Sequence, residues 1–390
     1  MKKKILLLCL ICIPVLITAV IGLINTKKSD STTDTENVSE NRPDWASLVV
    51  TDSLPLEYAT KFGVDFYGDD YTMINICDGS YFLVCKEGAP VPCNVPSGIT
   101  VLSQPVESIY LAATSAMNLF DALDSLDKIA LSGTDTDGWY IENAKAAMES
   151  GKIIYAGKYN KPDYELILSK GCGLVIESTM ISHAPEVKEK FLELGIPVLV
   201  DWSSYESHPL GRSEWIKLYG VLTGSLDLAV SEFEKQSAYL KDFSENNENK
   251  KTVAYFYISS QGSVVTRKSG DYVAKMIELA GGKYLFGSEK EDDTATSSMT
   301  LEMEKFYEQA RTADVIIYNN TTTDEVTNIS ELVAKNPLLN DFKAVRDGNV
   351  WCTGKNLYQE TLQFGRVIKD INLILNDGDE NQLHYFNRLR

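Results

Sequence analysis

Histidine is scarce in this chain of 390 residues. Only His183, His208 and His384 are present, and no two of them are spaced to share one face of a helix. Histidine is the commonest metal ligand and the side chain that titrates near neutral pH. The sequence therefore offers little material for a metalloenzyme or for a histidine-based hydrolase.

Nucleotide-binding and nucleophile signatures are also missing. Residues 151–159 place five residues between Gly151 and Gly157, one more than a phosphate loop allows, and Tyr159 stands where Ser or Thr would bind Mg²⁺. Gly171 and Gly173 lack the third glycine of a dinucleotide loop, and no Gly-x-Ser-x-Gly elbow occurs. These absences argue against a nucleotide-dependent enzyme and against an α/β-hydrolase.

Positive charge is in deficit. The chain has 37 Lys and Arg against 55 Asp and Glu, which gives a formal net charge of -18. Such a surface repels phosphate backbones and anionic lipids, so no nucleic-acid partner is expected.

Cysteines are few and unevenly placed. Cys9 and Cys12 lie in an N-terminal apolar run, and five others follow it: Cys77, Cys85, Cys93, Cys172 and Cys352. The odd count excludes complete intramolecular pairing, and free buried thiols are the simplest expectation. One disulfide among the three clustered cysteines at 77, 85 and 93 is the alternative.

The N-terminus has the pattern of an export signal. Three lysines precede an apolar run over residues 5–24, which is long enough to span a bilayer. Leu8 and Ile11 precede the two cysteines, where a lipoprotein signal would have a small residue. We therefore expect residues 1–28 to be an uncleaved anchor or a signal, with residues 29–47 as a disordered stalk outside the cytoplasmic membrane and cleavage as the alternative.

The rest of the chain predicts an α/β protein. Residues 48–104 predict a small antiparallel β-rich appendage, with a hairpin turn at Gly68-Asp69-Asp70. Strands and helices then alternate over residues 105–224 and again over residues 250–390, which is typical of two Rossmann-like lobes. Before the second lobe, a first helix is expected over about residues 212–222, ended by Gly224 as its C-terminal cap. One long linking helix is then expected over residues 225–249, with Ser225 as its N-cap.

Function should lie in the loops after the strands, because ligands bind beyond the carboxyl ends of parallel strands. These loops are rich in aromatic and hydrogen-bonding side chains, which suits a bulky and partly apolar ligand. The expected ligand contacts are Trp139, Tyr140, Tyr159, Glu177, Ser178, Met180, His183, Tyr205, Arg212, Tyr257, Arg267, Asn319 and Trp351. Trp202, Ser259 and Lys355 lie in the same loops. For each aromatic residue, packing in the core remains the alternative. For His183 the alternative is a surface or capping role, and for Glu177 it is capping of the helix that follows.

Several segments together resemble a known family. They are residues 110–116 (YLAATSA), 162–168 (PDYELIL), 194–200 (LGIPVLV), 278–282 (ELAGG) and 342–351 (FKAVRDGNVW), with the linking helix between them. In this order the chain resembles, over residues 105–390, the solute-binding proteins of ABC importers for iron complexes and vitamin B12, the class with a long linking helix.

The resemblance implies a non-enzymatic receptor. Such a protein captures a metal chelate outside the cell, in the cleft between its lobes, and delivers it to the permease subunits of an ABC importer. Iron-siderophore, haem and corrinoid all remain open as the ligand. Relatives that bind bare zinc or manganese use several histidines, so an organic chelate is expected here, with no resident cofactor, no protein-bound metal and a monomeric state.

The resemblance also implies permease-docking glutamates, one on each lobe. Glu165 fits the first lobe, and Glu304 is our choice for the second, with Glu302 and Glu308 as rivals. Two other hypotheses stay open. A cell-surface hydrolase would need Glu177 and His183 within hydrogen-bond reach. A sensor or adhesin would need a large exposed apolar patch and no closed pocket.

Overall fold

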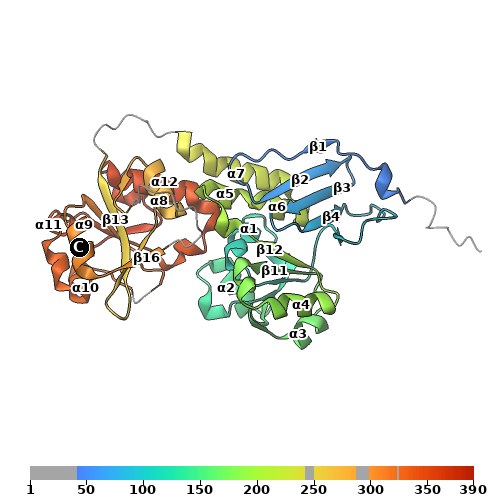
Figure 1. Cartoon of the computed structure of the whole chain (residues 1–390), viewed down its shortest axis with the longest axis horizontal. Coiled ribbons are helices and arrows are strands. Elements are labelled where there is room, and N and C mark those ends of the chain that lie inside the picture. The colour runs from blue at the N-terminus through green and yellow to red at the C-terminus, as the bar shows by residue number, and fades with distance from the viewer. Residues whose placement is uncertain (1–41, 242–249, 287–297, 323–324) are drawn as a thin grey trace, which may run out of the picture. The chain divides into compact units, whose positions relative to one another are not determined.

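The N-terminal region forms a five-stranded sheet in the order β1-β2-β3-β4-β5 (Figure 1). The computed structural model describes residues 42–241, 250–286, 298–322 and 325–390. The strands are β1 (Asp52–Ser53), β2 (Phe62–Tyr67), β3 (Tyr71–Ile76), β4 (Tyr81–Cys85) and β5 (Ile99–Ser103). The predicted hairpin is confirmed, since Tyr67 pairs with Tyr71 across the Gly68 turn. The prediction of a purely antiparallel sheet is wrong, because the long loop after β4 lets β5 join it in parallel.

A second sheet follows, with five parallel strands in the order β12-β11-β6-β7-β8. Its strands are β6 (Ile109–Leu111), β7 (Ile129–Ser132), β8 (Ile154–Tyr155), β11 (Leu174–Ser178) and β12 (Val198–Asp201). The intervening helices are α1 (Met117–Ala122), α2 (Glu142–Glu149), α3 (Tyr164–Ser169) and α4 (Pro185–Glu193). The short strands β9 (Gly157–Lys158) and β10 (Lys161–Pro162) form a separate pair. This sheet confirms the predicted alternation, and all five carboxyl ends lie at one edge.

A third sheet is built from the C-terminal part of the chain, in the order β16-β14-β13-β17-β18-β19, with β15 on β13. Its strands are β13 (Thr252–Ile258), β14 (Val264–Arg267), β15 (Lys283–Tyr284), β16 (Ser298–Leu301), β17 (Val315–Tyr318), β18 (Val350–Thr353) and β19 (Phe386–Arg388). Its helices are α8 (Tyr272–Leu279), α9 (Met303–Ala310), α10 (Ile329–Lys335), α11 (Lys343–Arg346) and α12 (Phe364–Leu375). The parallel strands β13, β17 and β18 were expected. Antiparallel strands extend them on both sides, with β14 and β16 beyond β13 and β19 beyond β18. With only three or four residues each, these strands are too short for a sequence pattern to predict them.

Three helices connect these two sheets in the sequence: α5 (Pro209–Glu214), α6 (Ile216–Thr223) and α7 (Leu226–Lys241). The single helix predicted over residues 212–222 is therefore two helices that meet at Trp215. Gly224 ends α6 with a φ of 81°, as expected for a left-handed cap. The 16 residues of α7 confirm the linking helix as far as Lys241, a length of about 24 Å at 1.5 Å per residue. Its predicted extension to residue 249 lies outside the described residues.

Helix α7 packs closely against α12, the closing helix. A Cβ atom added at Gly365 of α12 would lie 2.2 Å from the backbone oxygen of Gln236 on α7. The Gln236 side chain also donates to Gln363 at 3.1 Å and accepts from the backbone of Arg366. The absence of a side chain at Gly365 is thus what lets the two helix backbones approach.

Two buried carboxylates, Glu214 of α5 and Glu206 of the turn before it, join the segment that precedes β2 to this part of the chain. Glu214 accepts backbone N–H groups of residues 57–59, and its partner Lys217 lies 2.7 Å away. Glu206 accepts the backbone N–H groups of Thr60 and Lys61 and the Trp215 indole. Side chains of the N-terminal sheet and of the first parallel sheet form one hydrophobic cluster with α6 and α7. The predicted appendage is therefore built into the protein by a shared core, and its domain boundaries stay a prediction.

All five cysteines in the described part of the chain are free thiols. Cys85 is buried, Cys77 is exposed, and the Cys93 thiol lies 3.6 Å from the backbone oxygen of Arg42. The disulfide considered among these three is thus not formed.

No helix within the described ranges has both the length and the apolar character to cross a bilayer. The apolar run at residues 5–24 and the predicted stalk up to residue 41 lie outside those ranges.

Candidate functional site

Exposed apolar side chains gather at the carboxyl ends of the first parallel sheet. Tyr140 follows β7, Tyr155 ends β8, Met180 follows β11 and Tyr205 follows β12. These four side chains are 38–47% exposed. We call these three tyrosines and the one methionine the aromatic rim. Large apolar side chains gathered at one edge are a common mark of a ligand-binding or partner-binding surface.

A half-buried arginine lies beside this edge. Arg212 of α5 donates from Nη2 to the backbone oxygen of Ser204 at 2.5 Å. Its guanidinium carbon lies 3.8 Å from the ring centre of Tyr272, at the start of α8. Asp271, next to Tyr272, lies 3.8 Å from Arg267 of β14. We call Trp202, Ser204, Arg212, Asp271 and Tyr272 the Arg212 cluster, since they join the loop after β12 to helix α8.

The loop that carries Trp202 is held in place by hydrogen bonds to Asp201. Asp201 ends β12 and is almost fully buried; it accepts from the backbone N–H of Ser203 at 2.7 Å and from the hydroxyl of Tyr219 at 2.5 Å. Burial raises the pKa of Asp201, although both hydrogen bonds oppose this effect. Burial lowers the pKa of Arg212, and the nearby Tyr272 and Asp271 oppose that change. A rigid turn thus presents the Ser204 carbonyl to the arginine.

Several buried polar atoms in the described residues have no hydrogen-bond partner. They are Glu177 Oε1 and Oε2, Trp202 Nε1, Arg212 Nε, Asp271 Oδ2 and Asn319 Nδ2. Buried polar groups are nearly always paired, so unpaired ones mark places where water or a ligand can bind. Asp271 Oδ2 is the exception, because the Arg267 guanidinium lies 3.8 Å from it. Trp202 directly follows β12, and Asn319 directly follows β17. Two of the unpaired donors therefore lie at strand ends, where ligands of such sheets bind.

Glu177 is the most unusual of these groups. It lies on β11 with no exposed surface, and desolvation raises its pKa to about 8. At neutral pH its carboxyl group is mostly protonated, so it can donate as well as accept a hydrogen bond.

A cavity opens at the carboxyl ends of β13 and β17. Its volume is about 480 Å³, within the range of small-molecule sites. The lining residues are Tyr257, Ile258, Ser259, Ser260, Gly262, Thr322 and Lys335. Hydroxyl groups and one ammonium group make this cavity suited to oxygen-rich or anionic groups of a ligand.

The structure brings some predicted site residues together. Tyr140, Met180 and Tyr205 are in the aromatic rim, Arg212 is in its cluster with Arg267 close to Asp271, and Tyr257 lines the cavity. Tyr159 is half-buried between β9 and β10. Ser178 caps the short 3-10 helix Thr179–His183 by accepting from Met180, and His183 is exposed at its end.

Two predicted residues are placed in the core. Trp139 is 2% exposed and donates to the backbone oxygen of Thr134 at 3.2 Å. Trp351 is 4% exposed, and its indole donates to Asn349 at 2.8 Å, at the amino end of β18. Their environment matches the core-packing alternative, since both indole N–H groups are already satisfied inside the protein.

Sequence reasoning missed Asp271, Tyr272, Tyr358 and Lys335. Tyr358 could have been found by the strand-end rule, because it follows β18 closely. The other three depend on which helix ends reach the strand-end loops, and no local pattern carries that information.

The hydrolase alternative required a hydrogen bond between Glu177 and His183. Both Glu177 oxygens are without a partner among the described residues, so that pair is not formed. In the same part of the chain, no three His, Cys, Asp or Glu side chains are grouped to hold a metal ion.

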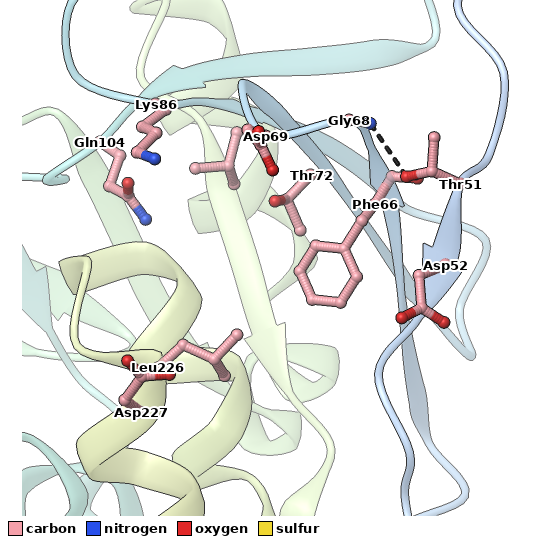
Figure 2. A pocket seen from close by; sticks show the side chains of 11 residues that line it. Thr51, Asp52, Phe66, Gly68, Asp69, Thr72, Lys86, Gln104, Leu226 and Asp227 are labelled. Atoms are coloured by element: carbon pink, nitrogen blue, oxygen red, sulfur yellow. Dashed lines mark hydrogen bonds between the residues drawn. The ribbon is translucent and has the colours of Figure 1, made fainter.

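Besides the cavity at the carboxyl ends of β13 and β17, a groove of about 620 Å³ lies between the N-terminal sheet and the first turn of α7, away from the ends of the parallel strands (Figure 2). Figure 2 shows Leu226 and Asp227 on the helix, opposite Phe66 and Thr72 on the sheet. The Gly68 N–H donates to Thr51 at 3.0 Å at its rim.

The predicted docking glutamates occupy matching positions. Glu165 is exposed in the first turn of α3, before β11, and Glu304 is exposed in the first turn of α9, before β17. The rivals Glu302 and Glu308 are exposed as well. Their role in docking stays a prediction.

Known proteins share this architecture. The family described as "Periplasmic binding protein" matches residues 113–357. An uncharacterized lipoprotein of Methanocaldococcus jannaschii (MJ0878) is 26% identical, covering 96% of this chain and 93% of its own.

Three solved structures have the same fold. The periplasmic haem-binding protein HutB of Vibrio cholerae has a TM-score of 0.55 at 17% identity, covering 67% of this chain and 97% of its own. The catecholate-siderophore-binding protein VctP of the same organism has a TM-score of 0.55 at 16% identity, covering 69% of this chain and 94% of its own. The vitamin B12-binding protein BtuF of Vibrio cholerae has a TM-score of 0.50 at 16% identity, covering 70% of this chain and 98% of its own.

The chain belongs to the periplasmic binding protein family. Its structural neighbours are haem-, vitamin B12- and siderophore-binding proteins of ABC importers, as the sequence resemblance implied. These relatives are binding proteins and not enzymes.

Proposed function

We propose that this protein captures a metal chelate outside the cytoplasmic membrane and delivers it to an ABC permease. The ligand is an iron-siderophore, haem or corrinoid, bound between two lobes at the carboxyl ends of the two parallel-stranded sheets. Family membership and the nature of the structural neighbours support this class of function.

One observation carries the proposal: buried donors without a hydrogen-bond partner lie at two strand ends and on the neighbouring helix α5. Trp202 Nε1, Arg212 Nε and Asn319 Nδ2 are three donors without a partner among the described residues. Oxygen-rich chelates supply the acceptors that such donors need, and their apolar parts match the aromatic rim. Leaving these donors unpaired costs free energy that a fitting ligand would recover.

Attachment to the membrane is part of the proposal. The apolar run at residues 5–24 would anchor the chain, with the binding region on the extracytoplasmic side. The Methanocaldococcus relative is named a lipoprotein, which supports a membrane-attached state. Lipid on Cys9 or Cys12 is the second route to the same location.

Equilibrium titration tests the proposal. The full-length protein is titrated with haemin, cyanocobalamin and a ferric tricatecholate, and tryptophan fluorescence is followed, because Trp202 lies in the proposed site. We expect saturable quenching by one ligand, weakened by Arg212→Met and unchanged by Arg346→Met, whose side chain is exposed on α11. Failure of all three ligands to bind would refute the proposed ligand class.

A further inference from the structure

The side chain of Gln359 links two loops that are far apart in the sequence. Its Oε1 accepts the backbone N–H of Tyr140 at 2.8 Å. Its Nε2 donates to the backbone oxygen of Gly138 at 2.7 Å and to the hydroxyl of Tyr358 at 2.9 Å. Gln359 has no exposed surface, and its amide acceptor and both its donors are used.

The two tyrosines held by Gln359 remain open to solvent. Tyr140 and Tyr358 are each 41% exposed, and their ring centres lie 6.3 Å apart at an interplanar angle of 74°. Tyr140 follows β7 of the first parallel sheet, and Tyr358 follows β18 of the C-terminal sheet. Each sheet thus contributes one ring to an edge-to-face pair at the carboxyl ends of its strands.

Further hydrogen bonds fix residues 360–362, which directly follow Gln359 in the sequence. Asn118 donates to Glu360 at 3.0 Å and accepts the backbone N–H of Leu362 at 3.0 Å. Ser213 donates to the backbone oxygen of Thr361 at 2.8 Å. A segment fixed at this many points loses little conformational entropy when a ligand contacts it, so the backbone that carries Tyr358 is preorganised.

We propose that Tyr140 and Tyr358 form a two-ring contact for a flat π-face of the ligand, and that Gln359 is the positioning residue for both, through the backbone N–H of Tyr140 and the hydroxyl of Tyr358. This inference rests on the proposed function and narrows its ligand class to chelates with a planar aromatic face. A porphyrin and a catechol ring share that chemistry, whereas a hydroxamate chelate without an aromatic ring lacks it.

The experiment uses the full-length chain and three probes: haemin, a ferric tricatecholate and ferrioxamine, which is a hydroxamate chelate. We expect haemin or the tricatecholate to bind more tightly than ferrioxamine. Tyr358→Ala should weaken that binding about two- to tenfold, as expected for loss of an aromatic pair contact. Tyr81→Ala, which removes an equally exposed tyrosine from β4, is the matched control and should leave affinity unchanged.

The positioning role is tested by combining variants. Gln359→Leu has nearly the same volume but no hydrogen bonds, and it should weaken the preferred probe to a similar degree. In the Tyr358→Ala background, Gln359→Leu should have much less effect, because one of the rings that it positions is gone. A merely structural role would weaken binding equally in both backgrounds, and that result would overturn the role given to Gln359.

The outcomes separate the two proposals. Binding of haemin or the tricatecholate that Tyr358→Ala leaves unchanged overturns the two-ring contact but keeps the proposed function. Preference for ferrioxamine likewise overturns the π-face inference alone. If none of these probes, nor cyanocobalamin, binds, the proposed function itself fails.

Discussion

Replacement of Glu177 by Gln should make the protein more stable at neutral and alkaline pH. Glu177 is fully buried on β11, neither of its oxygens has a hydrogen-bond partner in the described part of the chain, and burial raises its pKa from 4.5 to about 8. At roughly 1.4 kcal/mol for each pH unit, this difference costs about 5 kcal/mol of folding stability above pH 8. At pH 7 the cost is roughly 3 kcal/mol.

The direction follows from proton binding. Between pH 4.5 and about 8 the folded state keeps the Glu177 proton, while the unfolded chain loses it. The free energy of unfolding therefore falls as the pH rises through this window. Gln is similar in shape and has no proton to lose, so the Glu177→Gln protein should escape this decline.

Urea unfolding at pH 5 and pH 8, followed by tryptophan fluorescence, measures the effect. We expect the wild-type midpoint to fall relative to that of Glu177→Gln between the two pH values. Glu189→Gln, an exposed change on α4, should behave like wild type. Parallel pH dependence of wild type and Glu177→Gln would refute the reasoning, since it would mean that Glu177 is hydrated or paired in the folded protein.

Three further predictions follow from the fold and the proposed function. Gly365→Ala would place a methyl group against the backbone of Gln236, so it should destabilise the protein by about 1–3 kcal/mol and lower its melting temperature, whereas Gly270→Ala, with open space around it, should not. Burial lowers the pKa of His208 to about 4, so stability should be lost as pH falls from 6.5 towards 4; His208→Gln should reduce this loss in urea unfolding at pH 4.5, and an undiminished loss would contradict the assignment. Glu165→Lys and Glu304→Lys should lower uptake of the ligand by cells without changing its affinity for the isolated protein, and normal uptake by both variants would exclude these residues from permease docking.

The sequence by itself determined the local elements of this protein and their order. Val315–Tyr318 is a continuous apolar run and forms a buried strand, and Gly224 ends α6 because it tolerates a left-handed backbone. The alternation of such elements was sufficient to predict an α/β fold and the linking helix up to Lys241, while the strand-end loops as the place of function stay a prediction. These features depend on neighbours within a few positions along the chain.

Tertiary structure decided which strand-end residues face outward and which are paired. Trp139 and Tyr140 are adjacent, yet the first is core and the second is exposed. Glu177 is isolated because the elements around it bring no donor to its carboxylate. Gln359 reaches Tyr140 across 219 positions of sequence. Such contacts depend on how distant segments pack together, because burial and pairing belong to the assembled fold and not to any one segment of the chain.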